Sequence, residues 1–86
     1  MITITGYREV KYTELVEAIQ AHKQNSGKSD MQIAIEIGVS TQNTVKNINN
    51  DEQIVSDKVL TNTMQSIDLD GFVLSKDGCK TYYIKD

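Results

Sequence analysis

The sequence predicts a mainly α-helical domain with a small β element, in which four helices are followed by a C-terminal β-hairpin. The first two-thirds of the chain carries apolar residues at the three- and four-residue spacing of helices that bury one face. After residue 70 the pattern changes to two β-favouring runs around Asp77-Gly78, a strong short signal for a hairpin. With 86 residues, 38% of them hydrophobic, the chain can build one small core.

We expect a single domain over residues 1–86, made of three parts. Residues 1–10 form an N-terminal strand or arm, because "MITIT" resembles an alternating strand pattern. Residues 13–67 form the helical core, and residues 71–85 form the hairpin. A two-residue turn puts apolar side chains on both hairpin faces. One face carries Phe72, Leu74, Thr81 and Tyr83, and the other carries Val73, Tyr82 and Ile84.

Helix boundaries are marked by residues that cap free backbone groups. Ser29, with Gln32 three residues later, has the spacing of a capping box that opens the second helix. Gly38 is expected to end that helix in the left-handed conformation. The third helix is anchored in the core by Val45 and Ile48. The expected N-caps of the four helices are, in order, Thr13, Ser29, Ser40 or Thr41, and Ser56.

The second and third helices are joined by a short turn that starts at Gly38. The small side chain of Ala34 lets the third helix cross closely over the second, and Val39 fills the corner between them. Over roughly residues 13–67 this pattern resembles the Cro/repressor (Xre-like, lambda-repressor-like) family of helix-turn-helix proteins. The residues that carry the resemblance are Ala34, Gly38, Val39, Ser40, Val45 and Ile48.

The resemblance implies that the third helix lies in the major groove of double-stranded DNA. The chain is also similar to small regulators from phages and mobile elements of Bacteroidetes. Two features depart from the family pattern. Seven positions rather than six lead from Gly38 to Val45, and Asp30 stands where the family often has glutamine. We therefore assign outward positions by counting from the buried anchors Val45 and Ile48.

The outward positions of the third helix are rich in amides, and asparagine and glutamine can recognise adenine while lysine can reach guanine or phosphate. Four asparagines between residues 43 and 50 lower helix propensity, which favours base reading over simple solvation of an exposed helix. Backbone N–H groups near the two helix starts suit phosphate oxygens. The expected DNA-binding residues are Lys28, Ser29, Ser40, Thr41, Gln42, Asn43, Lys46, Asn47 and Asn50.

Other chemistry is not indicated. The sequence shows no Gly-rich phosphate loop, metal-ligand cluster or nucleophile–base pair, so we expect no enzyme activity, cofactor, metal site or small-molecule substrate. Cys79 is the only cysteine, which excludes an internal disulfide and favours a reducing compartment. No apolar run approaches the length of a membrane span, so we expect a cytoplasmic protein without membrane contact.

We expect a homodimer, because the hairpin has two partly apolar faces and one reading helix contacts few base pairs. The expected interface comprises Met31, Ile35, Val73, Tyr82 and Ile84, for which packing within the chain is the alternative. The expected function is sequence-specific binding of double-stranded DNA as a repressor-like transcriptional regulator. The alternative is an acidic protein-interaction module, such as an antirepressor or DNA mimic, favoured by the acidic segment 51–70 and the net charge of −3.

Overall fold

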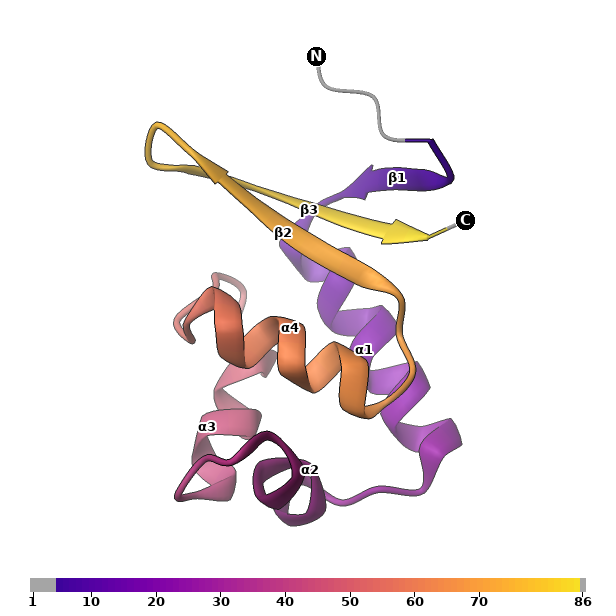
Figure 1. Cartoon of the computed structure of the whole chain (residues 1–86), viewed down its shortest axis with the longest axis vertical. Coiled ribbons are helices and arrows are strands. Elements are labelled where there is room, and N and C mark those ends of the chain that lie inside the picture. Colours follow the sequence, from indigo (N-terminus) through magenta and orange to yellow (C-terminus); the bar gives the residue numbers. More distant parts are fainter. Residues whose placement is uncertain (1–4, 86) are drawn as a thin grey trace.

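The computed structural model describes residues 5–85, which form four α-helices, a 3₁₀ turn and three strands (Figure 1). The expected class, mainly α-helical with a small β element, agrees with this arrangement. The elements are β1 (Tyr7–Val10), α1 (Tyr12–Ser26), α2 (Asp30–Ile37), α3 (Gln42–Lys46), the 3₁₀ turn η1 (Asn47–Asn49), α4 (Asp57–Ser66), β2 (Gly71–Lys76) and β3 (Cys79–Lys85).

The strands form one antiparallel sheet in the order β1-β3-β2, so β3 is central. Asp77 and Gly78 form the expected two-residue turn, with φ angles of 52° and 79° that match a type I′ turn. The N-terminal strand is also present, as β1. Residues 1–4 of the expected N-terminal strand or arm lie outside the described residues.

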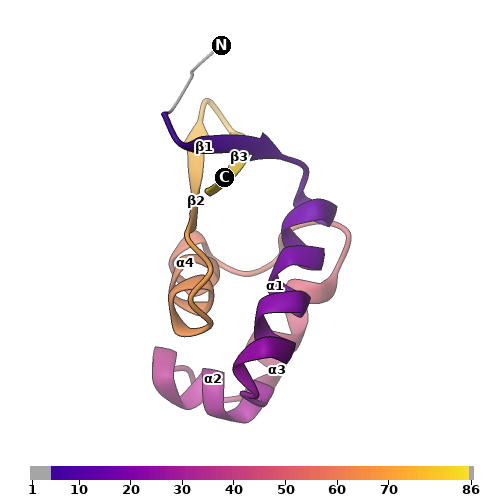
Figure 2. The same ribbon diagram turned by 90° about the vertical axis from the view of Figure 1, so that its right-hand side faces the viewer.

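The two faces of the sheet have different neighbours. The register places Val73 opposite Tyr82 and Gly71 opposite Ile84, on the face that packs on the helices. On the outer face the Phe72 ring stacks on the Tyr83 ring, with centroids 5.0 Å apart. Figures 1 and 2 show the sheet at one end of the molecule and α2 and α3 at the other, with α1 and α4 between them.

Three of the expected helix caps are confirmed. The side-chain oxygens of Ser29, Thr41 and Ser56 each accept a hydrogen bond from a backbone N–H two or three residues later. Gly38 ends α2 with φ 79°, in the left-handed region, as expected.

The predicted start of the first helix at Thr13 is wrong. Lys11 is the N-cap, and its backbone N–H donates to the Glu14 carboxylate at 3.2 Å. The helix starts early because Tyr12 is itself a core residue, 7% exposed, and burying its ring sets the position of the first turn.

The core lies between the helices and the inner face of the sheet. The expected anchors of the third helix, Val45 and Ile48, are buried. In α4, Leu60 and Met64 are buried and Val59 is half-buried. The largest fully buried apolar side chains are Leu15, Ile33, Ile48, Leu60, Met64 and Ile67.

Candidate nucleic-acid interface

The rotation of α3 is fixed by its two apolar anchors. Val45 is 4% exposed and Ile48 is 1% exposed, so both point into the core, as expected. Asn43, Lys46 and Asn47 consequently point to solvent, whereas Gln42 is half-buried. Counting from the anchors therefore identifies Asn43, Lys46 and Asn47 as outward despite the longer turn after Gly38, but it is only partly right for Gln42.

The third helix is shorter than expected. Its α-helical part ends at Lys46, and the chain then tightens into the 3₁₀ turn η1 rather than continuing to Asn50. Asn50 is extended, with φ −81° and ψ 158°, and its side-chain Nδ2 donates to the Asn47 carbonyl oxygen at 2.8 Å. Asparagine amides compete with helical backbone bonds in this way, which accounts for the early end of the helix.

Two side chains of α1 hold η1 in place. The Tyr12 hydroxyl donates to the Ile48 carbonyl oxygen at 2.8 Å in the core, and the Gln20 side-chain amide donates to the Asn49 side chain. The Tyr12 ring also packs against the Tyr82 ring, with centroids 5.1 Å apart. Sequence reasoning missed Tyr12 because it placed the helix start after this residue.

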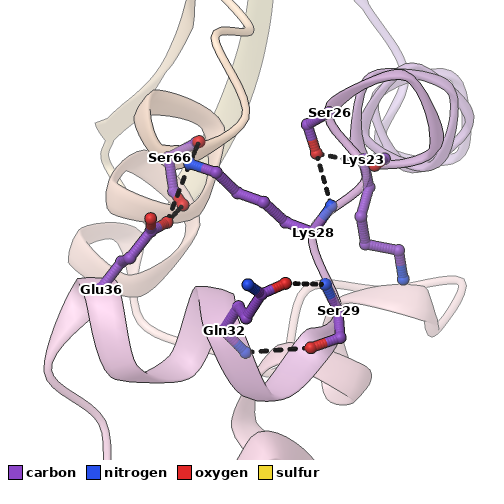
Figure 3. Close-up of polar contacts among 7 residues, drawn as sticks. All are labelled: Lys23, Ser26, Lys28, Ser29, Gln32, Glu36 and Ser66. Atoms are coloured by element: carbon purple, nitrogen blue, oxygen red, sulfur yellow. Dashed lines mark hydrogen bonds and ion pairs between the residues drawn. The ribbon is translucent and has the colours of Figure 1, made fainter.

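Lys28, one of the expected DNA-binding residues, has partners within the chain. Its ammonium donates to the Ser66 carbonyl oxygen at 2.5 Å and to the Glu36 carboxylate at 3.0 Å (Figure 3). The Ser66 hydroxyl donates to the same carboxylate, and these bonds, Ser66 first and Lys28 second, lower the pKa of Glu36. Lys28 thus connects the start of α2 to the last turn of α4, whose free carbonyl groups need donors.

Ser29 and Asp30 also have partners within the chain. The Ser29 hydroxyl accepts from the Gln32 backbone N–H at 3.2 Å, and the Ser29 N–H donates to the Gln32 side chain at 3.0 Å (Figure 3). The Asp30 carboxylate forms an ion pair with Lys23 at 2.8 Å. This pairing reduces the repulsion that an acidic residue at this position would exert on a nearby phosphate.

At the start of α3, Thr41 rather than Ser40 is the cap, since its hydroxyl accepts from the Asn43 backbone N–H at 3.2 Å. Both Ser40 and Thr41 are exposed. Lys46 is the only charged residue of α3 and, within residues 5–85, forms no ion pair. The surface formed by Ser40, Thr41, Asn43, Lys46 and Asn47 is defined as the α3 surface.

The expectation that Val73, Tyr82 and Ile84 form a dimer interface is wrong for their side chains. Ile84 is 6% exposed within the core, and Val73 and Tyr82 pack against that core. The hairpin register turns all three toward the helices, which cover this face of the sheet. Met31 and Ile35, by contrast, lie four residues apart on α2 and are 56% and 72% exposed.

Residues 5–85 contain no group of three His, Cys, Asp or Glu side chains placed to hold a metal ion. Within the same residues, every helix is too short or too polar to span a bilayer. Comparisons with known proteins identify no matching family model, no matching curated protein and no matching solved structure.

Proposed function

We propose that the protein is a sequence-specific double-stranded DNA-binding regulator of the repressor type, which reads the major groove with α3 and η1. In this proposal α2, the turn at Gly38 and α3 form a helix-turn-helix of the Cro/repressor kind. The observation that carries the proposal is the burial of Val45 and Ile48, which turns the amide side chains of Asn43 and Asn47 and the ammonium of Lys46 to solvent.

The chemistry of the α3 surface supports base reading. Asn43 is exposed in the first turn of α3, the part of a recognition helix that reaches base edges. Its amide offers both donors and an acceptor, so it can accept one base and reject another. α3 lies toward the end of the molecule away from the sheet (Figure 1), and every side chain of the α3 surface is exposed.

The charges around α2 and α3 favour recognition of bases over general attraction to phosphate. Lys23 and Lys28 are each paired with a carboxylate, which leaves Lys46 as the unpaired cation of α3 within residues 5–85. Few phosphates can then be neutralised, so binding to random duplex should be at or weaker than the usual ~10⁻⁴–10⁻⁶ M. Affinity for a specific site must come mainly from contacts to the bases.

A second candidate function is an acidic protein-interaction module on the same fold, such as an antirepressor or DNA mimic. Asp51 and Glu52 are exposed shortly after η1, and Ile54, next to them in the sequence after Gln53, is 61% exposed. An exposed apolar side chain close in the sequence to two carboxylates suits a protein surface better than it suits a phosphate backbone. Selection of bound sequences from a random pool of duplex DNA separates the two functions, because a module of this kind enriches no sequence.

Asn43→Ala should weaken binding to the selected duplex by about 1–3 kcal/mol and relax the preference at one base pair. The stability of the protein should stay within about 0.5 kcal/mol, because the Asn43 side chain is exposed and the capping bond uses its backbone. Fluorescence anisotropy with the selected duplex and all single-base variants of it measures both effects. An unchanged preference at every position would show that Asn43 does not read a base.

Lys46→Ala should weaken binding to all duplexes to a similar degree and reduce the slope of log affinity against log salt by ~1, if Lys46 contacts phosphate. Lys28→Ala is the matched control, because it removes the same charge but its ammonium is bound to Glu36 and Ser66. The control should leave the salt slope unchanged. Titrations of both variants at two salt concentrations give the slopes, and equal slopes for the two would contradict the assignment.

A further inference from the structure

β2 has an open edge with a regular pattern of free backbone groups. In a hairpin with a two-residue turn the flanking residues, Lys76 and Cys79, form a hydrogen-bonded pair, and such pairs recur at every second residue. The bond from the Lys85 N–H to the Asp70 carbonyl oxygen, at 2.9 Å, agrees with this alternation. The backbone N–H and C=O groups of Gly71, Val73 and Ser75 consequently point away from β3, and we call them the β2 edge.

The β2 edge has few of the devices that normally protect the side of a sheet, and Lys76, at the end next to the turn, is the only charged residue of the strand. β2 pairs with β3 without interruption over its six residues, so it contains no bulge, and it contains no proline. The other edge strand, β1, has only four residues, two of them Arg8 and Glu9. Within residues 5–85, the backbone groups of the β2 edge have no hydrogen-bond partner outside the sheet.

We propose that β2 pairs with β2 of a second copy of this chain, antiparallel about a twofold axis at Val73, so that the two sheets form one continuous sheet. The edge of a strand can pair with any extended strand, but the spacing of the free backbone groups on β2 also matches that of β2 in a second copy. The proposal goes beyond the proposed DNA-binding function and does not depend on it.

The twofold axis at Val73 follows from the spacing of the free backbone groups. In this register Val73 faces Val73 of the second copy, and Gly71 faces Ser75, so every residue of the β2 edge faces a partner with which it exchanges two hydrogen bonds. A register shifted by two residues leaves Gly71 or Ser75 without a partner in the other strand. A shift by one residue would bring residues from opposite faces together, which a continuous sheet does not permit.

The side chains of the outer face support the same register. Phe72 lies beside Leu74 of the second copy, and both are only half-buried within one chain. Asp70 lies opposite Lys76 of the second copy in this register. The Asp70 carboxylate already accepts a hydrogen bond from the Tyr7 hydroxyl at 2.7 Å and lies 3.7 Å from the Lys85 ammonium, so the side-chain support for the register comes from Phe72 and Leu74. The inner-face side chains Val73 and Ile84 stay in their own cores, because the contact is made through the backbone of β2.

This pairing also sets the direction of the two α3 surfaces. The helices pack on only one face of the sheet (Figure 2). A twofold axis perpendicular to the continuous sheet keeps the helices of both copies on that same side. Both α3 surfaces then face in one direction, as two half-sites on one side of a duplex require.

The experiment measures the mass of the free protein by analytical ultracentrifugation over a range of concentrations, without DNA. The wild type should sediment as a dimer of the 9.6 kDa chain at high concentration. Ser75→Pro removes an N–H of the β2 edge and should raise the dissociation constant of the dimer by about 10- to 100-fold. Glu9→Pro is the matched control, because it removes an outward N–H from the opposite edge, and it should leave the dissociation constant unchanged.

A second measurement keeps the proposal testable if Ser75→Pro does not fold. In a mixed sample of isotope-labelled and unlabelled wild type, NMR should detect an intermolecular contact between the Hα atoms of Phe72 and Leu74, which face each other in a non-hydrogen-bonded pair. A monomer at the highest concentration measured, an equal effect of the two proline variants, or a dimer without this contact would each overturn the proposal. Because DNA is absent, none of these results depends on the proposed function.

Discussion

Ile48→Ala should destabilise the protein by about 2–5 kcal/mol, because truncating a fully buried isoleucine leaves a cavity that the surroundings fill only in part. Ile48 is 1% exposed and is the buried anchor of η1, and few other large side chains are available to compensate in so small a core. For a domain of this size each kcal/mol lowers the Tm by about 4–8 °C. Urea and thermal unfolding followed by circular dichroism measure both quantities.

Asn47→Ala is the matched control for Ile48→Ala. Asn47 is the adjacent residue in the chain, but its side chain is exposed, and the bond that it receives from Asn50 is to its backbone carbonyl oxygen. Its substitution should change the free energy of unfolding by no more than about 0.5 kcal/mol. Similar decreases in the free energy of unfolding for the two variants would contradict the orientation of η1, because they would mean that the Ile48 side chain is no more buried than that of Asn47.

The parts of the fold that could be predicted from the sequence rest on local interactions. The caps at Ser29, Thr41 and Ser56 are bonds between residues two or three positions apart, so the sequence pattern contains both partners. The turn at Asp77 and Gly78 is equally local, because its positive φ angles suit these two residue types. Burial of Val45 and Ile48 could be predicted because only one face of a short helix is apolar.

The parts that could not be predicted rest on contacts between distant residues. The contact of Lys28 with the Ser66 carbonyl oxygen could not be predicted from the sequence. The two residues are 38 positions apart, and the acceptor is a backbone group that no sequence motif identifies. The bond from Tyr12 to the Ile48 carbonyl oxygen spans 36 residues. The hairpin pattern predicted two apolar faces correctly, but it could not tell that the helices would cover Val73 and Tyr82 rather than Phe72 and Leu74.

The candidate site is accordingly only partly contained in the sequence. The outward direction of Asn43 and Lys46 follows from the local pattern around Val45. The way α1 fixes η1 depends on Tyr12 and Gln20, whose contacts exist only once the core has formed. The position of the α3 surface therefore depends on the whole fold, and we expect a substitution in α1 to affect it.

Tyr12→Phe tests this connection and should destabilise the protein by about 1–3 kcal/mol. The substitution removes the hydroxyl that donates to the Ile48 carbonyl oxygen and leaves that buried acceptor without its side-chain donor, while the ring can still pack against Tyr82. Hydrogen exchange should therefore be faster at the backbone amides of η1 than in the wild type. An exchange pattern that is unchanged in η1 would contradict the role of Tyr12 in holding this turn.

The same substitution should change how stability depends on pH. Burial, and to a lesser extent the neighbouring Tyr82, raises the pKa of Tyr12 from 10.0 to about 12. A pKa that is higher in the folded state means that the contribution of Tyr12 is fully present below pH 10 and is lost as the pH rises toward 12. The difference in unfolding free energy between the wild type and Tyr12→Phe should therefore shrink between about pH 10 and about pH 12.

Urea unfolding of both proteins across this pH range measures the difference in unfolding free energy. The contributions of the other tyrosines cancel, because both proteins retain them. A difference that stays constant or widens would show that the Tyr12 hydroxyl is not buried in the folded protein.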